Sequence, residues 1–198
     1  MIIREYGAED ESGWVCCRVL SFLDSAYFDN VYRKKERYKN PSVELVAESD
    51  GKIVGLLDVE YESEPGQVCY LTGEVGAVIW HLAVLPEFRR RGIAAALLNE
   101  AVLRLKEQGV MRLEAWTRDD ERVIDWYEKR GFYKKESYLH VYAEGMECGD
   151  LAAVKLPRLF LCNCYGHYVG ENKEDILKRF KRVHECRLYE LLFSLLSK

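Results

Sequence analysis

The stretch Val84-Leu85-Pro86-Glu87-Phe88-Arg89-Arg90-Arg91-Gly92-Ile93-Ala94 leads from an apolar strand directly into the start of a helix. The first backbone N–H groups of a helix have no intrahelical partners, and the helix dipole adds partial positive charge at the same point. An anion such as a diphosphate can therefore bind there through backbone groups. Gly92 and the small Ala94 allow a close approach, and Arg89, Arg90 and Arg91 add positive charge with forked donors. Taken alone, the stretch also fits a solvated basic turn capped by glycine.

Regular elements are predicted on both sides of this junction. Residues 77–84 predict a buried strand, and apolar residues at helical spacing then continue to a stop at Gly109: Ala95, Leu98, Val102 and Leu105. Residues 111–117 predict a strand, residues 119–129 a helix, and Gly131-Phe132 a turn into a further strand. The middle of the chain therefore alternates strands and helices.

Two motifs in this region resemble the GCN5-related N-acetyltransferase (GNAT) family. That family has a strand ending in Ala-Val, then a Gln/Arg-x-x-Gly-x-Gly/Ala loop and a helix; here the loop positions are Arg89, Gly92 and Ala94. Its later Tyr-Glu-Lys-x-Gly-Phe segment matches Tyr127 to Phe132. The resemblance covers residues 1–145 and implies an α/β (α+β) fold, in which helices flank a mixed, mostly antiparallel sheet. It also implies acetyl-CoA as the cofactor.

The N-terminal part fits the same layout. Residues 1–6 predict an opening strand, and a helix follows with an apolar face formed by Trp14, Val15, Val19, Phe22 and Leu23. Residues 43–47 and 52–61 predict a hairpin, because Asp50-Gly51 is typical of a type I′ turn. We expect one acetyltransferase domain over residues 1–145 and an extension over residues 146–198 that packs on it or on a second subunit.

Composition limits the classes of protein. A chain of 198 residues with 48% hydrophobic residues is expected to form one globular core. The first residues lack a signal-peptide pattern and no run approaches the ~18 apolar residues of a membrane span. We therefore expect a cytoplasmic protein without a membrane partner. The seven cysteines, an odd number, fit reduced thiols better than a disulfide framework.

The net charge of −4 is unevenly distributed along the chain. Residues 1–80 carry a balance of −7 and residues 81–198 a balance of +3. A basic half suits an anionic cofactor and an acidic half suits a cationic acceptor, unless the charges are merely scattered over the surface. The overall acidic balance disfavours nucleic acid as a partner.

The resemblance implies a set of cofactor-binding and catalytic residues. A backbone N–H of the central strand usually polarises the thioester carbonyl in this family, and its position corresponds to Val84, with Leu82 nearby. The tyrosine that often protonates the thiolate corresponds to Tyr127. Many relatives have Asn seven residues before this tyrosine; Asp120 stands there and can cap the helix, but an ionised carboxylate donates no hydrogen bond. The cofactor-binding set is Leu82, Val84, Arg89, Arg90, Arg91, Gly92, Ile93, Ala94, Ala95, Asp120 and Tyr127.

The chain has no residue that corresponds to the general base of some relatives. Some relatives place Glu or His on the central strand where this chain has Trp80 and Val78, and neither can accept a proton. His81 follows Trp80 by one residue, so strand alternation predicts that its side chain faces the side of the sheet opposite to the side chains of Trp80 and Val78. Glu74 before the strand and Glu114 on the next strand could act through water. Our candidates for the catalytic residues are Tyr127, Glu74 and His81.

The last fifty residues lie outside the family pattern. Residues 158–165 predict a strand, and Asn172 could cap a long helix whose apolar face runs through Ile176, Phe180, Val183, Arg187 and Leu191 to Ser197. Such a face needs a partner, which makes a homodimer possible. Zinc ligation by Cys162, Cys164, His167, His184 and Cys186 is disfavoured, because their spacings differ from those of structural sites; no metal is expected.

Together these patterns predict an acetyl-CoA-dependent N-acetyltransferase that acts on a primary amine of a small, cationic molecule. Two alternatives stay open. One is a protein N-terminal or lysine acetyltransferase, which the Arg-x-x-Gly-x-Ala loop favours. The other is a catalytically silent acyl-CoA-binding sensor, which the missing strand carboxylate and Asp120 favour.

Overall fold

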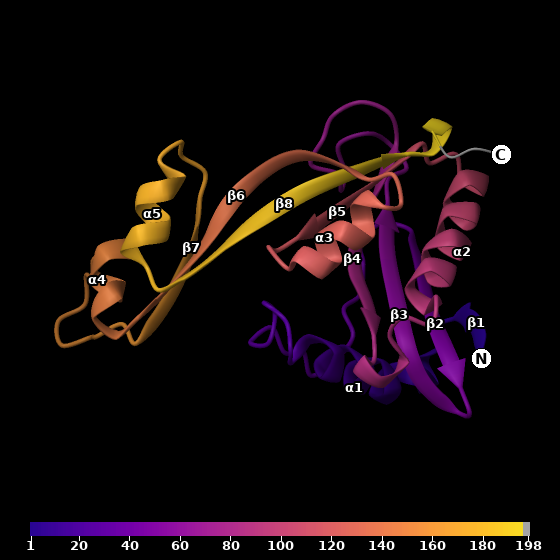
Figure 1. The fold of residues 1–198 in the computed structure, drawn as a ribbon, viewed down its shortest axis with the longest axis horizontal. Helices are drawn as coiled ribbons and strands as arrows, with labels where there is room; N and C mark the ends of the chain where they lie inside the picture. Colours follow the sequence, from indigo (N-terminus) through magenta and orange to yellow (C-terminus); the bar gives the residue numbers. More distant parts are fainter. Residues whose placement is uncertain (196–198) are drawn as a thin grey trace.

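A computed structural model describes residues 1–195, and these form one eight-stranded sheet with helices on both faces (Figure 1). The strand order is β1-β2-β3-β4-β5-β8-β6-β7. Strands β4 and β5 are parallel, and the other neighbouring strands in this order are antiparallel. The expected mixed, mostly antiparallel sheet is therefore confirmed. The strands and helices are β1 (Ile2–Glu5), α1 (Glu11–Phe22), β2 (Ser42–Ser49), β3 (Lys52–Tyr61), β4 (Gly76–Val84), α2 (Ile93–Glu107), β5 (Arg112–Thr117), α3 (Glu121–Glu128), β6 (Tyr133–Glu144), α4 (Cys148–Leu151), β7 (Asn163–Tyr168), α5 (Lys173–Arg179) and β8 (Arg182–Leu192).

Helices α1 and α2 cover opposite faces of the sheet. A Cβ at Gly55 of β3 would lie 3.0 Å from Ile93 and 3.3 Å from Leu97, so α2 packs directly on the backbone of this strand. On the other face, Arg18 of α1 donates a hydrogen bond to His81 of β4. Burial of apolar residues from both layers, among them Leu97 and fully buried Trp14, supplies the main core.

The β2–β3 hairpin has the predicted turn. Asp50 and Gly51 adopt φ angles of 52° and 76°, as a type I′ turn requires at both central positions, and Ser49 pairs with Lys52 across it. This turn sets the register of the two strands that precede the central β4.

Strands β4 and β5 separate partway along their length. Their pairing runs from Gly76 with Arg112 to Ile79 with Ala115, although β4 continues to Val84. Beyond Ile79, no strand within residues 1–195 pairs with this edge of β4. This opening lies beside the loop that leads into α2 (Figure 1).

The prediction that His81 and Trp80 face opposite sides of the sheet is wrong, because β4 has a bulge at this point. Asp58 of β3 pairs with His81 and Val59 with Ile79, so Trp80 is an extra residue without a partner. A bulge places two successive side chains on the same side of a strand. The indole of Trp80 donates to Glu60 at 2.8 Å, and Glu60 lies on the same face as Asp58. Trp80 and His81 thus share the α1 face.

The predicted C-terminal helix is wrong. Helix α5 ends at Arg179, and residues 182–192 form β8, which lies between β5 and β6. Residues 196–197 of the predicted helix lie outside the described residues. Residues 188–191, which include the charged Glu190, are all buried, because β8 is covered on both faces. The apolar residues Leu188, Tyr189 and Leu191 therefore do not alternate strictly, and their spacing does not distinguish a strand from a helix. The strand predicted over residues 158–165 begins only at Asn163.

Strands β6 and β8 extend beyond the main body and carry β7, α4 and α5 at their far end (Figure 1). One face of this arm has a second, small core that includes Leu139, Val141 and Phe180. Its other face carries Tyr138, His140 and Tyr142, since alternate residues of a strand face opposite sides. Among the described residues, no helix is both long enough and apolar enough to span a membrane.

Candidate active site

The N-terminus of α2 has the geometry expected of an anion site. Gly92 caps the helix with a φ of 80°, and its carbonyl accepts the first helical hydrogen bond, from Ala96 N at 2.9 Å. The preceding N–H groups, those of Ile93, Ala94 and Ala95, are the ones that a helix leaves without partners. No atom of the described residues lies within 4 Å of a Cβ placed at Gly92, so the surface there is open. A phosphate can reach these N–H groups directly.

The three arginines have different surroundings. Arg89 donates to both carboxylate oxygens of Asp24, at 2.8 and 3.0 Å, and to the carbonyl oxygens of Ser21 and Val84. The hydrogen bond from Arg89 lowers the pKa of Asp24. Because its donors are used within the protein, Arg89 joins the loop to the end of α1. Arg90 and Arg91 are exposed and remain beside the helix start.

The free edge of β4 carries the backbone donors predicted at Leu82 and Val84. The N–H of Leu85 donates to Val54 of β3 at 3.0 Å. Because successive N–H groups of a strand point in opposite directions, those of Val84 and Leu82 point away from β3. They face the side where β5 has separated from β4.

Tyr127 lies on α3, where it is almost fully buried. Its ring packs against Trp126, Phe132 and Tyr189, with centroid distances of 5.1, 5.0 and 6.1 Å. Burial raises the pKa of its phenol, which is therefore neutral at pH 7. Asp120 caps α3 as predicted, because its Oδ1 accepts from Arg122 N at 3.0 Å.

His81 lies on the α1 face in a buried pair with Glu36. Arg18 Nε donates to His81 Nδ1 at 3.3 Å, so the ring proton is on Nε2 and is donated to the Glu36 carboxylate. Burial lowers the pKa of His81. Burial acts to raise the pKa of Glu36, but the hydrogen bonds from His81 and Tyr32 and the nearby charge of Arg18 together outweigh it and hold that pKa below its ordinary value. The Glu36 side chain stays 38% exposed, which leaves a carboxylate at the surface.

A second buried charge lies beside His81. Lys35 Nζ contacts Glu44 at 2.6 Å and Asp58 at 3.2 Å, and Asp58 pairs with His81 in the sheet. Burial raises the pKa of Asp58 to about 7, although Lys35 opposes the rise. The sequence did not point to Lys35 or Glu36, because they lie in the irregular segment between α1 and β2 and follow no motif.

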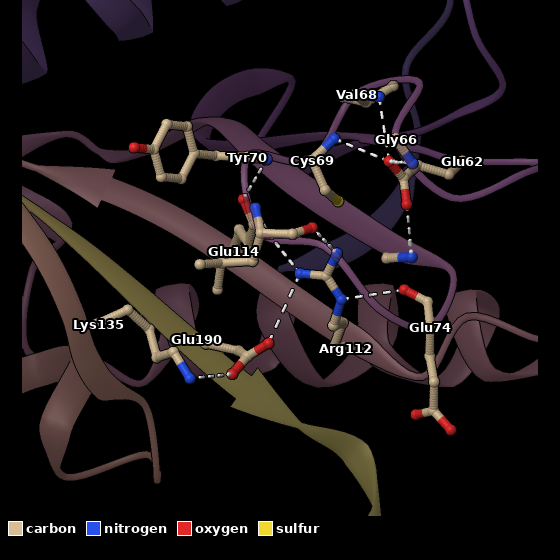
Figure 2. A network of polar contacts seen from close by, with 12 residues as sticks. Glu62, Gly66, Val68, Cys69, Tyr70, Glu74, Arg112, Glu114, Lys135 and Glu190 are labelled. Carbon is tan, nitrogen blue, oxygen red and sulfur yellow. Dashed lines mark hydrogen bonds and ion pairs between the residues drawn. The ribbon is translucent and has the colours of Figure 1, made fainter.

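The other two predicted carboxylates have different surroundings. Glu114 is fully buried, accepts from Tyr70 N and Leu71 N at 2.9 and 3.0 Å, and pairs with Arg112 (Figure 2). These contacts anchor a loop, and the carboxylate is buried away from solvent. Glu74 is exposed; its backbone carbonyl accepts from Arg112, and its carboxylate points away from the network in Figure 2.

The family model for the acetyltransferase (GNAT) family matches residues 12–132, more than half of the chain. The chain belongs to this family. Its members transfer an acetyl group from acetyl-CoA to an amine, so this GNAT protein is an acetyl-CoA-dependent N-acetyltransferase.

Solved structures of GNAT proteins share the fold. A ribosomal-protein-S18-alanine N-acetyltransferase from Escherichia coli superposes with a TM-score of 0.59 at 14% identity, over 100% of this chain and 96% of that one. A GNAT acetyltransferase from Elizabethkingia anophelis with acetyl-CoA bound gives 0.54 at 14% identity, over 97% of each chain. An aminoglycoside 6'-N-acetyltransferase from Acinetobacter haemolyticus gives 0.53 at 18%, over 69% of this chain and 93% of that one.

Proposed function

We propose that this GNAT protein acetylates a primary amine of a small, cationic molecule. The observation that supports this acceptor is the Glu36 carboxylate, which is held by His81 and partly exposed on the face opposite α2. A carboxylate in this position attracts an ammonium group and orients it by a charge-assisted hydrogen bond. The reactive nitrogen then approaches from the α1 face, while the cofactor occupies the other side of the opening.

Acetyl-CoA supplies an acetyl group activated as a thioester. Its diphosphate fits the N–H groups of Ile93, Ala94 and Ala95, because Gly92 leaves the space before them open. Arg90 and Arg91 add positive charge at the same place, whereas Arg89 acts by holding the loop.

Four groups of the chain take part in the reaction. The N–H of Val84, with that of Leu82 beside it, donates to the carbonyl oxygen on which negative charge develops, and a fixed backbone donor needs no reorganisation. The neutral phenol of Tyr127 holds the proton that the departing sulfur receives. Glu36 binds the ammonium form; because its pKa is low, the proton lost by the amine passes to water rather than to this carboxylate.

The test is release of free thiol from acetyl-CoA in the presence of polyamines, aminoglycosides, amino acids and peptides with free N-termini. We expect turnover with small cationic amines. Replacement Glu36→Gln should raise KM for the amine about tenfold, as expected for loss of a charge-assisted hydrogen bond, without changing CoA affinity.

A matched control is Glu174→Gln, which removes one exposed carboxylate on α5, far along the chain from the site. Turnover with peptides alone would support the protein acetyltransferase instead. CoA binding without turnover of any acceptor would support the silent sensor.

A further inference from the structure

Three aromatic rings from three different elements meet on the α1 face of the sheet. Tyr70 lies in the loop before β4, Trp116 on β5 and Tyr138 on β6. The ring centroids of Tyr70 and Trp116 are 5.5 Å apart with planes at 83°, and those of Trp116 and Tyr138 are 5.3 Å apart at 53°. Rings set at such angles present their faces in different directions, as the walls of a cation site do.

The register places these rings on the same face as His81. Cross-strand partners share a face, and Val78 of β4 pairs both with Glu60 of β3 and with Glu114 of β5. Residues two apart on a strand also share a face. Asp58 therefore shares the face of Glu60, and its partner His81 does too; Trp116 likewise shares the face of Glu114. The ring cluster and the His81–Glu36 pair therefore lie on the same face of the sheet, on opposite sides of the opening between β4 and β5.

The loop that carries Tyr70 is firmly attached to the sheet. Glu62 accepts from the backbone N–H groups of Gly66, Val68 and Cys69, and Glu114 accepts from those of Tyr70 and Leu71 (Figure 2). The Tyr70 side chain is nevertheless 59% exposed. A rigid backbone with an exposed ring is the arrangement expected of a binding residue rather than a core residue.

One carboxylate beside the rings has no opposite charge. Glu136 precedes Tyr138 by two residues on β6, is exposed, and raises the pKa of the nearby Tyr70 phenol. Neighbouring cations are used elsewhere: Lys135 pairs with Glu190, and Arg187 with Glu185. Within residues 1–195, Glu136 forms no ion pair. Three rings beside an unpaired carboxylate make a surface complementary to a cation.

We propose that Tyr70, Trp116, Tyr138 and Glu136 bind a second positive charge of the acceptor, so that the enzyme prefers elongated diamines or polyamines to monoamines. This inference rests on the proposed function. From a rise of about 3.3 Å per residue and a strand spacing of about 4.8 Å, the backbone of Trp116 lies at least about 11 Å from the Val84 N–H, so the second ammonium group must be several methylene groups from the reactive one.

The experiment compares octamethylenediamine and spermidine with octylamine as acetyl acceptors. We expect kcat/KM to be higher for the two polycations. Replacements Tyr70→Leu and Glu136→Gln should each lower that value about three- to thirtyfold for the polycations, while octylamine changes by less than about twofold. Tyr70→Phe keeps the ring and should recover most of the loss. The control Tyr165→Leu removes a ring that is 69% exposed on β7, outside the cluster, and should have no effect.

A binding measurement keeps this inference separate from the proposed function. Titration with tetramethylammonium should change the fluorescence of Trp116, with the Trp116→Phe variant as the reference, and Tyr70→Leu should weaken the change. If that response is seen but no amine is acetylated, the cation site stands and the proposed function fails. Equal losses for octylamine and the diamine, or no response to the cation, would overturn the cation site.

Discussion

Tyr127 combines a position in the core with the proton-donor role that we propose for it. Its ring is packed among three aromatic neighbours, and its phenol is kept neutral by the same burial. Replacement by Phe keeps the packing and removes the proton donor. We predict that Tyr127→Phe lowers kcat about 10²-fold, with unchanged CoA affinity and unchanged thermal stability.

The control for this variant is Tyr189→Phe. Tyr189 is stacked on Tyr127 and its hydroxyl donates to Glu128 at 2.8 Å, so its loss tests removal of a buried hydroxyl nearby. Steady-state kinetics and CoA titration should separate the two variants. A Tyr127→Phe enzyme with normal kcat would remove this tyrosine from the proposed mechanism.

Asp58 gives a pH dependence of stability at the residue scale. Its pKa in the folded protein is about 7, raised by burial from 3.8. The stability supplied by the protonated carboxyl is complete below pH 4 and is lost as the pH rises to 7. We predict that Asp58→Asn stabilises the protein relative to the original chain by up to about 4 kcal/mol at pH 8, and by little at pH 4.

Urea unfolding at several pH values measures this difference. Lys35 also contacts Glu44 at 2.6 Å, so we expect the lysine to keep this partner in the variant. A stability difference that is the same at pH 4 and pH 8 would show that folding does not raise the pKa of Asp58.

At the scale of elements, the loop before β4 is held where side chains pack closely against the backbone of Gly76, the first residue of β4. A Cβ at Gly76 would lie 2.7 Å from Cys69 Sγ and 3.0 Å from Arg112 Cζ, so both neighbours would have to move. We predict that Gly76→Ala costs about 1–3 kcal/mol of unfolding free energy, and that part of this is recovered in a Cys69→Ala background. Urea midpoints of the four chains in the cycle test the contact.

Gly149→Ala is the matched control, because in the described part of the chain nothing lies within 4 Å of a Cβ at Gly149 of α4. Its effect on stability should be small. If Gly76→Ala lowered the unfolding free energy equally in the original chain and in the Cys69→Ala background, a contact other than that with the Cys69 sulfur would be responsible for the loss.

At the scale of the whole molecule, the cofactor site should couple to global stability. A ligand that binds only the folded chain, at 100-fold excess over its Kd, adds about 2.7 kcal/mol to the unfolding free energy. We predict this gain for CoA in thermal unfolding, and its loss in Gly92→Glu, which places a negative charge where the diphosphate would bind.

Gly92→Ala separates charge from backbone strain. Both variants force a side chain to a φ of 80°, and each has open space around the new Cβ. The alanine chain should be somewhat less stable without CoA but should still gain stability from it. If the glutamate variant gained as much from CoA as the alanine variant, the diphosphate would not bind at this helix start.

What the sequence determined by itself is local. The Asp50-Gly51 turn, the strand from Gly76 to Val84 and the glycine before α2 follow from residues close together in the chain, because turn geometry and helix capping depend on near neighbours. The family motifs added the cofactor and the type of reaction.

Only the tertiary structure decided how distant segments combine. Residues 182–192 form a strand because they pair with β5 on one side and with β6 on the other. This pairing, and the burial of the strand on both faces, outweigh the helical spacing of Val183, Arg187 and Leu191. The bulge at Trp80 exists only relative to β3, and Glu36 meets His81 across 45 residues of chain. Such contacts depend on burial and pairing between segments, and no local pattern carries that information.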